Sequence, residues 1–168
     1  MEARIEGTGN DDNLYGTAGD DRIFASGGND IVDAGSGFDL INGGFGNDAI
    51  HAGEGDDILI GGAGADSLYG ESGNDMIMSG KGNDLMAGGS GDDHYIYYRG
   101  DGIDTILDVS TTEAGNTLLL GDITYWDIQG KIEVTNGEII LRISSEDEIH
   151  LTGIDPETGL STSHTVDV

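Results

Sequence analysis

Apolar residues recur every nine positions between Gly7 and Ile96. This stretch divides without a gap into ten units of nine residues, and the eighth place of each unit is Leu, Ile or Val in eight units. The last two units have Met86 and Tyr95 at that place. The first six places are rich in Gly and polar residues. The pattern therefore predicts turns of six residues alternating with strands of three residues, each with its central side chain in a core.

Strands this short are not stable alone, so we expect two units to form one coil of eighteen residues. Successive coils would then stack as parallel strands in a solenoid. The core of such a solenoid holds only one apolar side chain per strand. Ordering about 90 residues costs roughly 1–2 kcal/mol each, which so thin a core does not offset. The sequence therefore predicts a second interaction that holds the turns together.

The sixth place provides the groups for that interaction, because it is Asp in every unit. The fourth place is Gly in nine units and Asn10 in the other, and both types accept positive φ. Stacked coils would bring the sixth-place carboxylates together in two rows, with successive members about 4.8 Å apart. One row is Asp12, Asp30, Asp48, Asp66 and Asp84, and the other is Asp21, Asp39, Asp57, Asp75 and Asp93.

Without counterions, these rows of like charges would repel. Calcium takes 6–8 oxygen ligands and would fit between the carboxylates and the carbonyls of the Gly-rich turns. Five carboxylates in each row leave four gaps, so we expect about eight calcium ions. Residues 7–108 carry 20 acidic and 3 basic side chains, a net charge of -17. Eight divalent ions would add about +16, which nearly balances it.

The composition of the whole chain excludes several other functions. Its 168 residues include 33 Asp and Glu against 6 Lys and Arg, a net charge of -27 that disfavours nucleic acid and anionic membranes as partners. There is no cysteine for a disulfide or thiolate site, and no apolar run long enough to span a membrane. The N-terminal residues lack the apolar core of a signal peptide, so we expect either a cytosolic chain or export independent of the N-terminus.

Candidate catalytic groups are sparse. The four histidines, His51, His94, His150 and His164, have no spacing typical of a metal or acid–base pair. No serine lies in a G-x-S-x-G turn, and Gly80–Gly82 lacks the spacing of a phosphate loop. We therefore expect this chain not to be an enzyme.

The nine-residue units resemble the calcium-binding repeats of the RTX (repeats-in-toxin) family, and the resemblance covers residues 7–96. It implies an all-β fold, a right-handed parallel β-roll with calcium between its turns. It also implies a secreted, extracellular protein that leaves the cell through a type I secretion apparatus. The ten sixth-place Asp residues match the liganding aspartate of the family. The carbonyls of five turn residues match its backbone ligands: Gly43, Phe45, Gly61, Gly62 and Gly64.

The chain departs from the family pattern in its first two places. Glu71 stands where Gly is usual in the second place. The first place is not Gly at Ala25, Ala34, Ala52 and Ser79.

The register changes after Tyr95. Asp104 follows Asp93 by eleven residues, so Tyr97, Tyr98 and Arg99 should enlarge a last coil, and we expect Asp104 to join the calcium ligands. Residues 105–153 have few glycines and predict strands at 116–123, 131–134, 138–143 and 148–154. Asn136-Gly137 between two of them is typical of a β-hairpin.

We interpret the later strands as a C-terminal β capping segment that covers the open end of the solenoid. The segment is similar to the domain that trails RTX repeats. The expected domains are therefore a β-roll at 7–108 and a cap and tail at 109–168.

With the eighth place inside, the seventh and ninth places face outward. In the even-numbered units these places form a mostly apolar face that a monomer rarely leaves wet. We expect residues 105–153, an upstream domain or a second copy to cover it, with contacts at Ile58, Ile60, Met76 and Met78.

The function that these features favour is a calcium-binding module, folded by calcium, at the end of a larger secreted RTX protein. Two alternatives stay open: an accessory module of a secreted RTX enzyme (lipase, protease or polysaccharide epimerase), or part of an adhesin.

Overall fold

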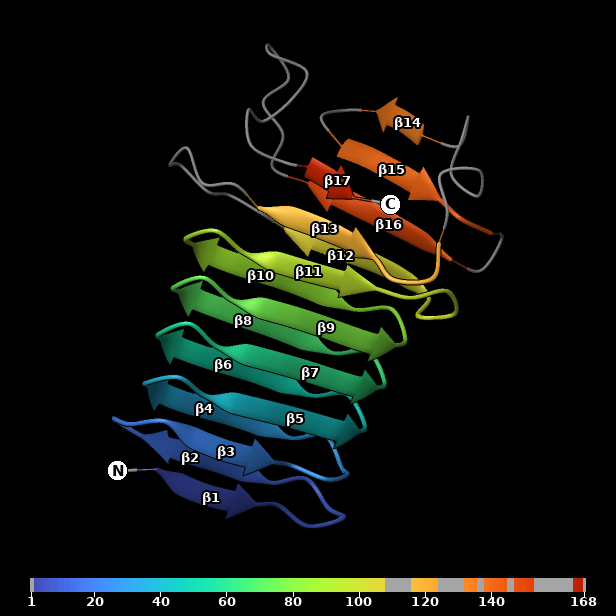
Figure 1. The fold of residues 1–168 in the computed structure, drawn as a ribbon. Helices are drawn as coiled ribbons and strands as arrows, with labels where there is room; N and C mark the ends of the chain where they lie inside the picture. Colours follow the sequence, from blue (N-terminus) through green and yellow to red (C-terminus); the bar gives the residue numbers. More distant parts are fainter. Residues whose placement is uncertain are drawn as a thin grey trace.

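Two β-sheets run the length of the molecule, one behind the other, and the chain passes alternately between them (Figure 1). The computed structural model describes residues 2–107, 116–123, 132–135, 138–144, 147–152 and 165–167. Within these residues there is no helix, and thus none long and apolar enough to cross a membrane.

The first sheet, here called sheet A, has eight strands. In spatial order they are β1 (Ala3–Glu6), β3 (Asp21–Phe24), β5 (Leu40–Phe45), β7 (Ile58–Ala63), β9 (Met76–Lys81), β11 (His94–Tyr97), β13 (Thr117–Leu120) and β17 (Thr165–Asp167). All of its neighbouring strands are parallel.

The second sheet, sheet B, has nine strands. In spatial order they are β14 (Ile132–Thr135), β15 (Glu138–Arg142), β16 (Glu148–Thr152), β12 (Ile103–Leu107), β10 (Leu85–Ser90), β8 (Ser67–Ser72), β6 (Ala49–Glu54), β4 (Ile31–Ser36) and β2 (Asn13–Thr17). From β2 to β16 its strands are parallel, whereas β14, β15 and β16 pair antiparallel.

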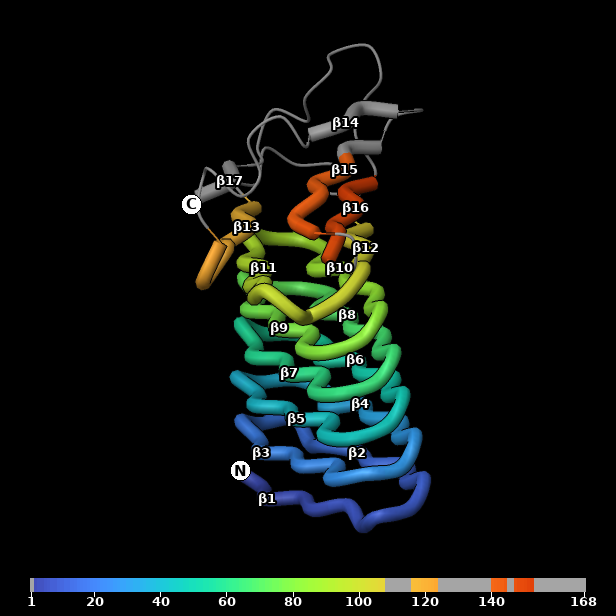
Figure 2. Tube along the Cα trace, turned by 90° about the vertical axis from the view of Figure 1, so that its right-hand side faces the viewer, coloured from blue at the N-terminus to red at the C-terminus, as the bar shows by residue number. Residues whose placement is uncertain are grey.

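Strand pairing repeats at eighteen residues, so that Ile23 pairs with Ile41 and Ile41 with Leu59. Even-numbered units therefore supply sheet A and odd-numbered units sheet B, and each pair of units makes one coil (Figure 2). This arrangement confirms the predicted parallel β-roll.

Most central strands are longer than the three residues predicted. β7, for example, begins at the seventh place of one unit and continues through the third place of the next. Its pairing with β9 includes Gly62 with Gly80 and Ala63 with Lys81. The glycine-rich places therefore contribute half of the strand, because stacking on the neighbouring coil supplies hydrogen-bond partners that a local pattern does not reveal.

The core is a thin layer of side chains between the sheets, in which the first-place residues Ala25, Ala34 and Ala52 are buried beside the eighth-place residues. From the second unit on, the eighth-place residues from Ile23 to Tyr95 are buried, with at most 2% of their surface exposed. Leu14, in the first unit, packs against this core and is partly buried. Ile106, Leu118 and Ile149 extend the core beyond the repeats. The predicted inward direction of the eighth place is thus confirmed.

The outer face of sheet A carries the apolar residues expected there. Met76 is 38% exposed, whereas Leu40, Ile58, Ile60 and Met78 are half-buried. Strands β12, β13 and β16 continue the two sheets in parallel register. That this face is covered stays a prediction.

Beyond the repeats, the strands expected at 116–154 are present as β13 to β16. Thr135 of β14 pairs with Glu138 of β15, so the predicted hairpin forms, although Asn136 and Gly137 lie outside the described residues. His164 also lies outside them. The last coil of the repeats is two residues longer than the others, because Asp104 pairs twenty residues from Asp84.

The single-layer core makes an eighth-place substitution costly. We expect Ile50→Ala, in a fully buried position of β6, to lower the free energy of unfolding by about 2–5 kcal/mol. Ile31→Ala is the matched control on the neighbouring strand, since its side chain is 50% exposed, and should change it by less than about 1 kcal/mol. Denaturant titration in saturating calcium measures both, and equal losses would contradict the assignment of the core.

Candidate metal centre

The sixth-place aspartates lie where each turn enters a strand, on the two edges of the roll. Those from Asp21 to Asp93 are at most 3% exposed, and Asp104 is fully buried. The turn geometry therefore places the carboxylates inside the stack of coils, in the two rows that the spacing predicts.

One oxygen of each interior carboxylate binds the backbone of the preceding coil. The N–H of Asp30 donates to Oδ1 of Asp48 at 2.8 Å, and the N–H of Asp39 donates to Oδ1 of Asp57 at 2.7 Å. The same bond joins Asp84 to Asp104 at 3.0 Å, so Asp104 follows Asp84 at the end of this row, and its role as a calcium ligand stays a prediction. Each N–H offsets part of the repulsion between successive carboxylates.

The other oxygen, Oδ2, has no hydrogen-bond partner in eight of these residues although it is buried. They are Asp30, Asp39, Asp48, Asp57, Asp66, Asp75, Asp84 and Asp93. A buried, ionised oxygen without a partner is strongly unfavourable. Eight such atoms in regular rows therefore indicate a cation as the missing partner.

Carbonyl oxygens approach the same space. A methyl group built on Gly61 would lie 2.6 Å from Oδ2 of Asp66 and 2.5 Å from the carbonyl oxygen of Ser79 in the next coil. On Gly70, a methyl group would likewise meet Oδ2 of Asp75 and the carbonyl of Gly88. The first place of a turn thus borders a position where a carboxylate and a carbonyl converge.

These donors fit calcium. All are hard oxygen atoms, carboxylate and carbonyl, which calcium prefers and which suit softer metals poorly. Among the described residues no group of three or more His, Cys, Asp or Glu side chains is arranged for a metal, so backbone oxygens must complete the ligand set.

The five turn residues whose carbonyls match the backbone ligands of the family occupy three kinds of position. The carbonyl of Phe45 accepts the N–H of Gly28 at 2.9 Å and so already has one partner. Methyl groups built on Gly80 and Gly82 would collide with the carbonyls of Gly62 and Gly64, which face the next coil. Gly43 and Gly61 stand at first places beside Oδ2 of their own units. Their role as ligands stays a prediction.

The electrostatics of the interior carboxylates follow from their burial. Burial raises the pKa of Asp57 to about 6 and those of Asp66 and Asp75 to about 7, although each accepts a backbone N–H that acts in the opposite direction. Neighbouring carboxylates of the same row raise these pKa values further. Without a cation, these groups therefore resist ionisation near neutral pH.

The ends of the rows differ from the interior. Burial acts to raise the pKa of Asp21, but N–H groups of Ala3 and Thr17 donate to its carboxylate and lower the pKa below the usual value. Asp12 accepts from Thr8, and Asp104 accepts from the hydroxyl of Ser79. These three carboxylates have protein partners at the atom that is free in the interior.

The fifth-place residues form a second row of side chain to backbone hydrogen bonds, here called the fifth-place ladder. It runs beside the sixth-place carboxylates and was not predicted from the sequence. The side chain of Asn29 accepts the N–H of Asn47 at 2.8 Å, and that of Asp56 accepts the N–H of Asn74 at 2.8 Å. The signal was present in the sequence, because eight of the ten fifth-place residues are Asp or Asn. Phe38 and Ala65 are the exceptions.

The three histidines that the structure describes do not meet in one site. His51 lies on the outer face of sheet B, stacked on Tyr69 and 2.9 Å from the carboxylate of Glu71. His150 lies on β16 beside Glu148, and His94 is exposed on β11 of sheet A.

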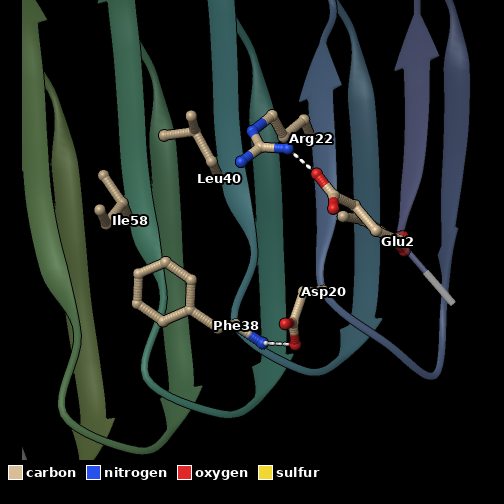
Figure 3. Close-up of a pocket in the computed structure, with 7 residues that line it drawn as sticks. Glu2, Asp20, Arg22, Phe38, Leu40 and Ile58 are labelled. Atoms are coloured by element: carbon tan, nitrogen blue, oxygen red, sulfur yellow. Dashed lines mark hydrogen bonds and ion pairs between the residues drawn. The ribbon is translucent and has the colours of Figure 1, made fainter.

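A shallow depression on the outer face of sheet A has a volume of about 160 Å³. Phe38, Leu40 and Ile58 form its apolar wall (Figure 3). Its charged groups are engaged, since Arg22 pairs with Glu2 and Asp20 accepts the N–H of Phe38 (Figure 3). Each of these charged residues therefore already has a partner within the protein.

Comparison with known proteins agrees with this geometry. The RTX calcium-binding nonapeptide repeat (four copies) matches the chain in overlapping segments at residues 6–41, 35–68, 42–77, 60–95 and 69–106. No curated protein sequence matches the chain.

Two solved structures match parts of their chains to this one. The extracellular lipase LipA from Serratia marcescens matches with a TM-score of 0.41 and 16% identity, over 99% of this chain and 40% of the lipase. The AlgE6R3 subunit of the Azotobacter vinelandii mannuronan C5-epimerase matches with a TM-score of 0.46 and 21% identity, over 94% of this chain and 80% of that subunit.

The raised pKa values predict that acid favours the calcium-free fold. A folded pKa of about 6–7, above the ordinary 3.8, means that the folded state binds protons more tightly, so its stability is lost as pH rises through 6–7. Calcium-free protein should therefore gain β signal in circular dichroism as pH falls from 8 to 5.5. In the triple variant Asp57→Asn, Asp66→Asn, Asp75→Asn this gain should shrink. A flat or opposite response in the unsubstituted protein would contradict the assigned burial.

Proposed function

Because the chain belongs to the family of RTX calcium-binding nonapeptide repeat proteins, we propose that it is a calcium-folded module of a larger secreted protein. The observation that carries this proposal is the set of eight buried Oδ2 atoms without a hydrogen-bond partner. Calcium would be held by these carboxylates together with turn carbonyls, and it would supply the positive charge that lets the coils stack.

The physical role of such a module is a switch in chain compactness. In a calcium-poor cytosol, a net charge of -27 and unpaired rows of carboxylates would keep the chain extended. An extended chain suits passage through a type I secretion apparatus. Extracellular calcium modules bind at roughly 10⁻⁴–10⁻³ M, so millimolar calcium outside the cell would fold the chain after export.

The activity of the parent protein would reside elsewhere in it. The repeat match covers a binding module, and the described histidines lie apart. The same module would serve a toxin, a secreted lipase, protease or polysaccharide epimerase, or an adhesin, since each needs the repeats to fold outside the cell.

Calcium titration followed by far-ultraviolet circular dichroism tests the proposal. In a chelator at pH 7.5 the chain should be disordered, and millimolar calcium should produce β structure in a steep, cooperative transition. Magnesium should not replace calcium, because it dehydrates reluctantly and requires tight octahedral geometry.

Two substitutions distinguish loss of a calcium ligand from loss of one negative charge. Asp57→Asn removes an interior carboxylate and should raise the calcium midpoint several-fold. Asp33→Asn removes the same charge from an exposed position on β4 and should leave the midpoint within about twofold of the unsubstituted protein. A chain that is fully folded in chelator, or equal shifts in the two variants, would rule out the proposal.

A further inference from the structure

The carboxylates at the ends of the two rows differ from those in the interior in the hydrogen bonds that their Oδ2 atoms accept. In each sixth-place carboxylate from Asp30 to Asp93 the Oδ2 atom accepts no hydrogen bond, whereas in Asp12, Asp21 and Asp104 it does. The difference follows from particular residues at the first and second places, as the contacts below show.

At the N-terminal end, threonine occupies the second place of the first two units. The N–H and hydroxyl of Thr8 donate to Oδ2 of Asp12 at 2.6 and 2.8 Å. The N–H of Thr17 donates to Oδ2 of Asp21 at 2.6 Å, and its hydroxyl bonds Oδ1 at 3.2 Å. Each terminal carboxylate is therefore satisfied by its own turn.

The backbone of these two turns also differs from that of the other eight. From the third unit to the tenth, every second-place residue has positive φ: Ser26, Gly35, Gly44, Gly53, Gly62, Glu71, Gly80 and Gly89. Thr8 and Thr17 do not adopt positive φ, and neither do Asn10 and Gly19 at the fourth place. A β-branched residue is disfavoured in the left-handed region, whereas Ser26 and Glu71 are held there by the stacked coils. Threonine thus selects a turn whose N–H points to the carboxylate.

At the C-terminal end, two other residues close the rows. The hydroxyl of Ser79, which stands where Gly is usual, donates to Oδ2 of Asp104 at 3.1 Å in a fully buried position. In the other row Asn116 replaces the aspartate and accepts the N–H of Asp93 at 2.7 Å. A neutral amide needs no counterion, and it too is fully buried.

We propose that these four groups, Thr8, Thr17, Ser79 and Asn116, terminate the calcium array, which is thereby confined to the eight interior carboxylates. The inference rests on the proposed function and narrows it. Asp12, Asp21 and Asp104 act as structural acceptors of protein hydrogen bonds and do not ligate calcium. The first coil is then able to form without metal. The calcium-dependent coils stack on it.

Calcium stoichiometry tests this assignment. Equilibrium dialysis or native mass spectrometry in saturating calcium should give eight ions for the unsubstituted chain. Asp12→Asn, Asp21→Asn and Asp104→Asn should each keep eight, whereas Asp48→Asn and Asp57→Asn should each lose at least one. Asparagine preserves the size of the side chain, and circular dichroism in saturating calcium confirms that each variant is folded.

The reverse experiment removes the N-terminal closure. Thr8→Gly combined with Thr17→Gly removes both hydroxyls and permits positive φ at the second place, the conformation of the eight later turns, in which no N–H binds Oδ2. The double variant should therefore bind more ions than the unsubstituted chain. Thr105→Gly, at a half-buried place on the outer face of β12, is the matched control and should leave the stoichiometry unchanged.

The outcomes separate this inference from the proposed function. No calcium binding by the unsubstituted chain would refute both. Normal binding with an ion lost in Asp12→Asn, or with no gain in the Thr8 and Thr17 double variant, would refute the closure of the array alone.

Discussion

The fold depends on buried carboxylates that are only half satisfied. In each interior one, Oδ1 accepts a backbone N–H, whereas Oδ2 has no hydrogen-bond partner in the protein. The apolar core contains only one or two side chains per strand, and stacking brings the carboxylates of successive coils together. On the function proposed above, the coils would close once a cation reaches these oxygens. Folding and metal binding would then be one process, in which the cation serves as a structural component.

The sixth-place and fifth-place side-chain ladders both position the coils, but they bond in opposite directions along the roll. At the sixth place, the carboxylate of one coil accepts an N–H from the coil before it, whereas at the fifth place Asp or Asn accepts an N–H from the coil after it. Each turn is therefore bonded in both directions along the roll axis. This arrangement fixes the spacing of the coils at the two edges, where the strands themselves have ended, and so keeps the carbonyl and carboxylate oxygens in register.

Much of the fold and of the carboxylate rows was predictable, because the same nine-residue pattern occurs ten times. The identity of the sixth place and the apolar eighth place predict the rows of carboxylates, the core and the eighteen-residue register. The true length of the strands was not predictable, because glycine-rich places pair only once a neighbouring coil is present. The fifth-place ladder was overlooked because Asp and Asn alternate there irregularly, although both accept the same N–H. Ser79 is a departure from the first-place Gly, and Thr8 and Thr17 stand at the second place without any signal of a role. Only the contacts of their N–H and hydroxyl groups reveal what these residues do.

Because units alternate between the two sheets, the β-roll tolerates insertions and deletions of eighteen residues differently from those of nine. Adding or removing eighteen residues inserts or deletes a whole coil, and every later side chain keeps its sheet and its direction. A change of nine residues keeps the sixth and eighth places in phase but transfers every later unit to the opposite sheet. The largely apolar exterior of sheet A, with Leu40, Ile58 and Met78, would then be joined end to end with the mixed exterior of sheet B, with Ile31, Asp33 and His51. Surfaces of uniform character on a β-roll thus persist only when its length changes in whole coils.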